Sequence, residues 1–261
     1  MFTANPFAAL SDFWSPLVMQ SYLVLMALAV AAGTLFDVVH KGSAEYFFEN
    51  WRKSKSKSAQ QLSGGELVAI AVKTGVVDVL ASGEFCNARR RVAHLLTMYG
   101  FLLYVISTVI MVFAYPTPAT PTPAILPQLW WLGGLMACLG GYWFWFFIRV
   151  DVLAEGHSPF RVVRADLFIL SLLASVTLGL IWAFVQAWGG SGAGVLFGLY
   201  VIATTVLFAS VPWSKFAHMF FKPAAAFEKR VSHAIGFRSN LPAPADKPEQ
   251  FGIAREQPRH Y

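Results

Sequence analysis

Long apolar runs, each of roughly 20 residues with almost no charge, recur five times along the chain. An α-helix of that length can cross the hydrocarbon core of a bilayer. The pattern therefore predicts an all-α integral membrane protein with five transmembrane helices. The expected spans are Phe13 to Val39, Val92 to Tyr115, Leu129 to Ile148, Leu167 to Trp188 and Val195 to Phe221.

Strongly polar residues are few within these runs. Gln20, Asp37 and Gln186 lie toward the ends of their runs, where we expect their side chains to reach water. The runs themselves are thus suited to lipid and to packing against one another.

The polar remainder of the chain has structure of its own. In the loop 41–91, Ser63 and Glu66 have capping-box spacing before an apolar stretch that also carries Lys73 and Asp78. We expect an interfacial or protein-covered helix there, and a second one in the segment that ends near Ile235. The predicted organisation is a five-span membrane domain over 1–238, with the loop 41–91, and a disordered or partner-binding tail over 239–261.

Composition and charge agree with this class and add an orientation. The chain is 56% hydrophobic and 13% charged. Its 20 Lys and Arg residues fall between spans one and two, between spans three and four, and from Lys215, near the end of span five, onward. Basic residues resist translocation, which puts the N-terminus outside and the C-terminus in the cytoplasm. Anionic lipid accounts for most of the basic excess, so we expect no nucleic-acid partner.

The motifs of several enzyme classes are missing. The two cysteines, Cys86 and Cys138, are too few for an iron–sulfur cluster, and the sequence has no Walker loop, dinucleotide fingerprint or HExxH motif. Span three carries two glycine pairs at 133–134 and 140–141, which favour close packing of a helix and, less strongly, of a flat cofactor.

Three of the six histidines stand at the predicted cytoplasmic ends of spans: His40, His94 and His218. Each alone is typical of a side chain that reaches for water. Two on different helices at one depth can instead hold a haem iron from both sides. Basic residues nearby would offset the haem propionates: Arg89, Arg90, Arg91 and Lys215.

The stretches "RRRVAHLLTMYGFLLYV" and "PWSKFAH" resemble the haem b (gamma) subunit family of respiratory nitrate reductase and of sulfur-metabolism complexes. Within that family, the chain is most similar to the membrane anchors of dissimilatory adenylylsulfate reductase. The resemblance implies that His94 and His218 are the axial ligands of the inner haem. The outer ligand positions hold Tyr104, ten residues after His94, and Tyr200, 18 residues before His218. We therefore expect one haem b near the cytoplasmic face and no outer haem, with His40 as runner-up ligand or quinone contact.

The resemblance implies a location in the bacterial inner membrane and a role in electron transfer. A non-catalytic subunit would link a cytoplasmic flavin and iron–sulfur reductase, such as adenylylsulfate reductase, to membrane quinone. Two other classes stay open: a haem-free structural anchor, and a small-solute or proton transporter. The transporter is less favoured because the spans hold few ionisable groups and no evident inverted repeat.

Overall fold

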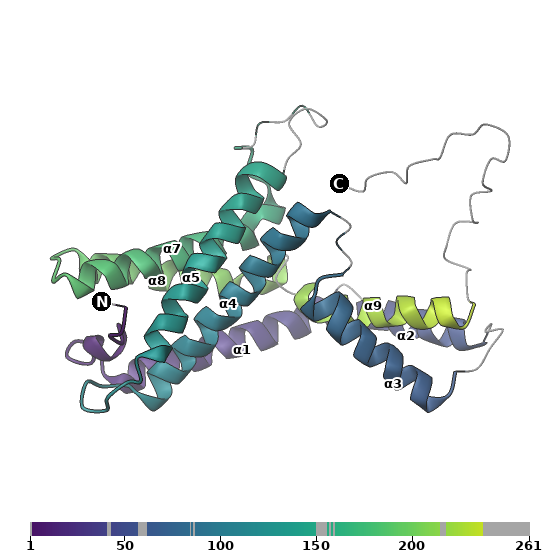
Figure 1. The fold of residues 1–261 in the computed structure, drawn as a ribbon, viewed down its shortest axis with the longest axis horizontal. Coiled ribbons are helices and arrows are strands. Elements are labelled where there is room, and N and C mark those ends of the chain that lie inside the picture. The colour runs from purple at the N-terminus through teal and green to yellow at the C-terminus, as the bar shows by residue number, and fades with distance from the viewer. Residues whose placement is uncertain are drawn as a thin grey trace. The chain divides into compact units, whose positions relative to one another are not determined.

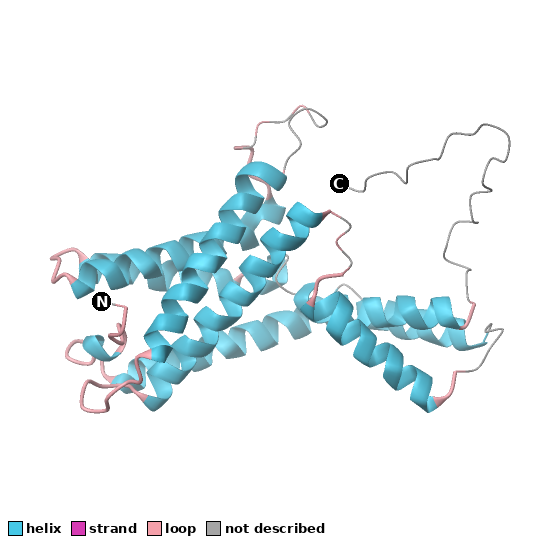
Figure 2. Ribbon diagram, in the orientation of Figure 1, coloured by secondary structure: helices cyan, strands magenta, loops and turns pink. Residues whose placement is uncertain are grey.

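The structure, a computed structural model, describes residues 2–40, 43–56, 62–83, 85, 87–149, 156, 158, 160–214 and 218–236. Over these residues the regular structure is entirely helical, with no strand (Figures 1 and 2). The α-helices are α1 (Pro16–His40), α2 (Ser43–Ser56), α3 (Gly64–Lys73), α4 (Ala88–Ala114), α5 (Ile125–Trp143), α7 (Leu167–Ala187), α8 (Ala193–Ala209) and α9 (His218–Ala234). Two π-helical segments, η2 (Thr74–Leu80) and η3 (Phe144–Ile148), and three 3-10 turns, η1 (Ala8–Leu10), η4 (Arg164–Asp166) and η5 (Val211–Trp213), complete the set.

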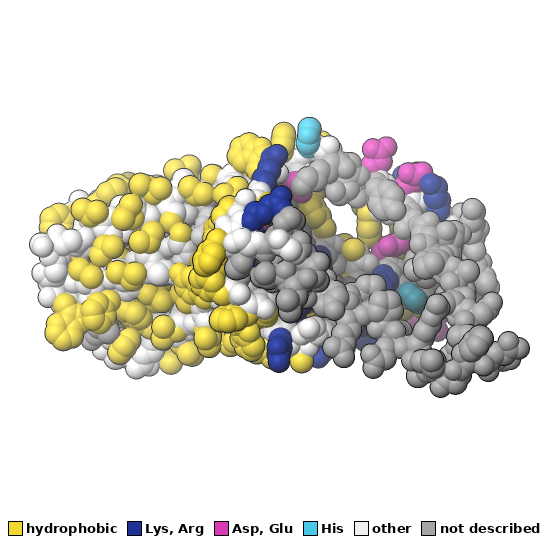
Figure 3. All heavy atoms as spheres, turned by 90° about the horizontal axis from the view of Figure 1, so that it is seen from above, with side chains coloured by type: hydrophobic (Ala, Val, Ile, Leu, Met, Phe, Trp, Pro, Cys, Tyr) yellow, Lys and Arg dark blue, Asp and Glu magenta, His cyan; other side chains and the backbone are white. Residues whose placement is uncertain are grey.

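Four helical stretches are long and apolar enough to cross a membrane: Pro16–His40, Ala88–Ala114, Ile125–Ile148 and Arg164–Ala187. They coincide with the first four predicted spans, and the all-α class is confirmed. In the view of Figure 3, hydrophobic side chains cover much of the visible surface of the part of the chain that holds these helices. A surface of that kind is suited to lipid rather than to water, so the chain belongs to the class of multi-pass helical membrane proteins.

The chain divides into two compact units. The apolar unit comprises Met1–Lys41 and Asn87–Met219, and the polar unit comprises Gly42–Cys86 and Phe220–Tyr261. The predicted loop 41–91 and the segment ending near Ile235 thus fold together rather than lying separately.

Within the apolar unit, α4 and α5 touch backbone to backbone. A Cβ added at Gly133 would lie 2.6 Å from the Tyr104 amide nitrogen, and one added at Gly140 would lie 2.6 Å from the Ala93 carbonyl oxygen. Gly134 and Gly141 face α7 instead, where an added Cβ would lie 2.7 Å from a methyl carbon of Leu180 or Leu173. The glycine pairs of span three therefore serve helix packing, the favoured interpretation of the sequence.

The fifth apolar run differs from the sequence prediction. Helix α8 pairs with α7 but ends at Ala209, and the chain then makes the turn η5. Pro212 explains the stop, because a proline ring clashes with the carbonyl four residues earlier, here that of Phe208. The expectation of one helix from Val195 through Phe221 is therefore wrong, since His218 begins a new helix, α9.

The polar unit is a small helical assembly of α2, α3, η2 and α9. Its core joins Val231 of α9, and Ile235 just after α9, to Trp51 of α2 and to Leu67 and Ile70 of α3. The predicted capping box is confirmed: the Ser63 hydroxyl accepts from the Glu66 amide, and the Glu66 carboxylate accepts from the Ser63 amide. The sequence predicted that this helix, α3, is either interfacial or covered by protein. Its Leu67 and Ile70 side is covered by protein.

Candidate functional site

His94 lies about two turns from the N-terminal end of α4, shortly after the three arginines of its first turn. Asn87 caps this helix, accepting from the backbone amides of Arg89 at 2.9 Å and Arg90 at 3.3 Å. His94 is half-buried, and the preceding Ala93 is fully packed against α5. The histidine is thus held on a well-capped, rigid helix.

The face of α4 that carries His94 points toward the end of α8. Phe101 follows His94 by seven residues, close to two helical turns, and so lies on the same face. The Phe101 ring lies 6.3 Å from that of Phe208, in the last turn of α8. A group held between α4 and the chain after α8 would therefore meet His94.

The other predicted ligands are placed less fully. His218 is the first residue of α9, and the structure describes its backbone but not its side chain. Lys215 lies outside the described residues. His40, the runner-up, is exposed at the end of α1, where its ring stacks on Phe36 with 5.3 Å between centroids.

The three arginines at the start of α4 differ in their surroundings. Arg89 is exposed, whereas Arg90 and Arg91 are half-buried. The Arg90 guanidinium donates to the backbone carbonyl of Ile148 at 3.4 Å, which ties the start of α4 to the end of η3. Arg89 is the member of the cluster most open to an anionic group.

A buried ion pair closes the same end of α5 and α7. The Arg149 guanidinium donates to both carboxylate oxygens of Asp166, and it lies 4.0 Å from the ring centre of Trp145. Asp166 also accepts from the Val163 amide at 2.9 Å. Because each charge has several partners, this pair is a structural joint between η3 and the start of α7.

Tyr104 and Tyr200, at the outer ligand positions of the resemblance, lie together in the core of the apolar unit. Both are almost fully buried, and Gly179 of α7 packs against both: its added Cβ would lie 2.2 Å from the Tyr104 hydroxyl and 3.1 Å from the Tyr200 ring. Trp130 stacks on Tyr104 at 4.8 Å, and Trp182 stacks on Tyr200 at 5.7 Å. Aromatic side chains therefore fill the space around the outer positions.

One of the three polar residues expected to reach water is buried. Asp37 is only 2% exposed, so the expectation for this residue is wrong. Gln20 and Gln186 are half-exposed, and their side chains donate to backbone carbonyls of other segments, those of Val112 and Pro6. In an apolar unit, a partner within the protein satisfies a polar group better than distant water does.

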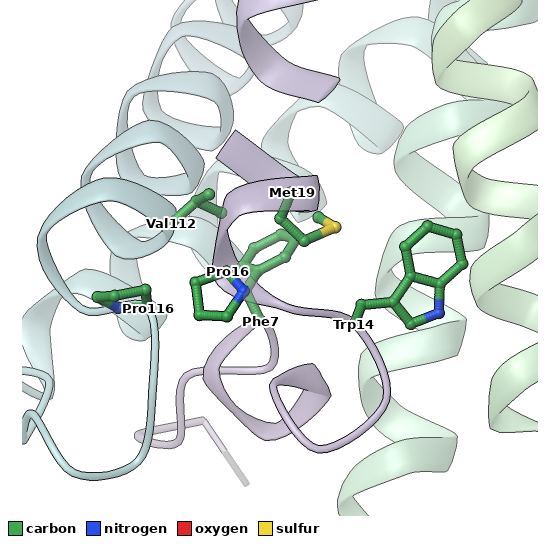
Figure 4. A pocket seen from close by; sticks show the side chains of 6 residues that line it. All are labelled: Phe7, Trp14, Pro16, Met19, Val112 and Pro116. Atoms are coloured by element: carbon green, nitrogen blue, oxygen red, sulfur yellow. The ribbon is translucent and has the colours of Figure 1, made fainter. Parts of the chain in front are cut away.

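The described residues show no ready-made metal cluster. No three His, Cys, Asp or Glu residues among them gather as metal ligands. Figure 4 shows a cavity of about 10 Å³ in the apolar unit, room for one water at most. Its lining comes from the N-terminal segment, α1 and the end of α4: Phe7, Trp14, Pro16, Met19, Val112 and Pro116.

Comparison with known proteins adds one relative. Citrate utilization protein B of Escherichia coli is 28% identical over 168 residues, which cover 60% of this chain and 42% of that protein. The match therefore spans less than half the length of the relative. No protein-family model matches the chain, and no solved structure matches it.

Proposed function

We propose that this protein is a membrane anchor and electron-transfer subunit. It would link a cytoplasmic flavin and iron–sulfur reductase, such as adenylylsulfate reductase, to the quinone pool of the bacterial inner membrane through one haem b. The observation that carries the proposal is His94, half-buried on the α4 face that points toward the end of α8. The family resemblance supplies the chemistry expected at that place.

Contacts inside the polar unit support five spans. The Arg230 guanidinium of α9 binds the Asp78 carboxylate of η2, and Phe227 stacks on Trp51 of α2. These segments must therefore lie on one side of the membrane. Helices α4, α5 and α7 separate them in sequence; if these three helices each cross the membrane, α8 would make the fourth crossing between the two segments. At 17 residues it is about 25 Å long, at the short end of what spans a bilayer.

The donor set fits a haem of type b. Imidazole nitrogens are axial ligands of haem iron, and such a haem carries single electrons between donors and acceptors. In this proposal His94 of α4 and His218 at the start of α9 would bind the iron. Arg89, Arg90, Arg91 and Lys215 would offset the propionates, and the exposed His40 would be a quinone contact or an alternative ligand.

The filled outer half supports one haem rather than two. Tyr104, Tyr200, Trp130 and Trp182 are each at most 6% exposed and pack ring against ring. A second haem would need that volume, and close-packed interiors do not open at little cost. The quinone would then exchange electrons in the inner leaflet.

In this proposal the substrate chemistry of a complex would lie in the cytoplasmic reductase and not in the membrane module. The polar unit would be the docking surface, since it holds most of the basic residues.

The pyridine haemochrome of the purified protein tests the proposal. We expect one haem b per chain, lost in both His94→Ala and His218→Ala. His233→Ala is the matched control, since His233 is exposed on α9, and it should keep the haem. Two haems per chain, or one haem that survives both substitutions, would contradict the assignment, and a protein without haem would be the structural anchor.

A further inference from the structure

The position of His218 depends on the turn between α8 and α9. If α8 continued straight, the nine residues from Ala209 to His218 would add about 14 Å along its axis. Instead Pro212 stops the helix, and the turn folds back on the apolar unit. Val211 is 0% exposed, while Ser210 and Ser214 are each 7% exposed. The depth of His218 therefore depends on this turn and on what holds it.

Helix α1 lies directly against the turn. A Cβ added at Gly33 would lie 3.0 Å from the Val211 Cβ and 3.0 Å from the Pro212 Cδ. The next residue of α1 on the same face, four positions later, is Asp37, which is buried at 2% exposure. The neighbouring Ala31 and Ala32 are exposed, so the contact belongs to one face of α1.

We propose that Gly33 and Asp37 are positioning residues: α1 clamps the turn Ser210–Ser214 and so fixes the place of the haem ligand His218. This inference rests on the proposed function, because it assigns the clamp to a haem site. Gly33 packs against the turn, Asp37 is buried on the same face of α1, and both would act through His218 rather than by touching the haem.

Packing and desolvation give the physical reason. Two axial ligands must meet one iron within a small tolerance, which requires support around each ligand. Because the Gly33 backbone packs closely against the Pro212 ring, the turn cannot shift along α1 without a clash. A carboxylate within an apolar helix is costly unless it is engaged by the protein, and Asp37 occurs on the one face of α1 that meets the turn. The position of the turn along α1 is thereby fixed.

The first experiment tests the clamp without any haem. In a background with Cys86 and Cys138 replaced by serine, Gly33→Cys and Val211→Cys are combined, and the membranes are oxidised. After cleavage in the loop 41–91, the two fragments should stay joined until reductant is added. Ala32→Cys with Val211→Cys, from the exposed face of α1, should give separate fragments. Separate fragments from the Gly33 pair would overturn the clamp.

The second experiment asks whether the clamp positions the ligand. Gly33→Leu should lose the low-spin signal of a haem with two histidine ligands, whereas Ala32→Leu should keep it. Gly33→Ala, a smaller intrusion at the same contact, and Asp37→Leu should weaken the signal, and Asp37→Asn should retain more of it than Asp37→Leu. A signal unchanged in both Gly33 variants would overturn the positioning role.

A third measurement separates this inference from the proposed function. If the wild-type protein holds no haem, the electron-transfer proposal fails. The rate at which a water-soluble maleimide labels a His218→Cys variant still tests whether α1 positions residue 218. Gly33→Leu should then change the labelling rate at position 218, and Ala32→Leu should not. Equal rates in the two backgrounds would show that α1 does not position residue 218.

Discussion

At the scale of single residues, Gly179 is a position where the core has very little room for a larger side chain. An alanine there would place its Cβ 2.2 Å from the Tyr104 hydroxyl and 3.1 Å from the Tyr200 ring. We expect Gly179→Ala to lower the stability of the detergent-solubilised protein by about 1 to 3 kcal/mol, as overpacking does. The midpoint of thermal unfolding measures this loss.

Two further variants identify the cause of the loss at Gly179. The Tyr104 hydroxyl interacts with the side chain of Tyr200 but makes no well-formed hydrogen bond among the described residues, so Tyr104→Phe alone should cost little. Combined with Gly179→Ala, it should recover part of the lost stability, because the closest clash is removed. Gly198→Ala, where an added Cβ meets open space, should be close to neutral. A similar loss in Gly198→Ala would point to helix flexibility and not to the clash.

The pair of Asp78 and Arg230 is a second residue-scale determinant, and it should make the polar unit sensitive to acid. The Arg230 guanidinium donates to the two Asp78 oxygens at 2.5 and 2.7 Å. These bonds lower the pKa of Asp78 below its usual value. A carboxyl whose pKa falls on folding stabilises the folded state above its unfolded pKa of about 3.9. That contribution is lost as the pH drops through the lower, folded value.

Asp78→Asn should therefore weaken the docking of α9 on η2 at neutral pH by about 1.5 to 3 kcal/mol, the range for hydrogen bonds to charged groups. Amide exchange of α9, corrected for the intrinsic rate at each pH, measures this. The difference between wild type and variant should narrow as the pH falls below about 3.9, toward the lowered pKa of folded Asp78. Glu49→Gln is the matched control, since Glu49 pairs with Lys53 on the exposed surface of α2 and should matter little. A difference that did not narrow as the pH fell below about 3.9 would exclude the charge as its cause.

At the scale of elements, hydropathy and capping carried the prediction far. The four long apolar helices follow from length and composition alone, because a bilayer demands both. The capping box at Ser63 follows from local hydrogen bonding, which needs no tertiary contact. The end of α8 was missed although Pro212 stands in the sequence: the surrounding residues stay apolar, so hydropathy does not register the stop.

The candidate site was only partly accessible to sequence reasoning. His94 and the tyrosines emerge from the resemblance and from counting along the chain. The role proposed for α1 does not, because Gly33 meets the turn after α8, and Asp37 is buried, only in the tertiary fold. Asp37 shows the limit clearly: its place near the end of an apolar run predicted water contact, and packing buries it instead.

At the scale of the whole molecule, the number of crossings is the central expectation. We predict that reporter fusions after Ser43 and Lys247 are cytoplasmic and that fusions near Thr120 and Ser191 are periplasmic. The Ser191 and Lys247 fusions bracket α8, the helix shortest for a span. If α8 stayed on one side, α9 would be separated from α2 and η2, and the bonds between Arg230 and Asp78 could not form. Periplasmic signals from both bracketing fusions would therefore contradict the five-span topology and the polar unit together, whereas opposite signals require α8 to cross.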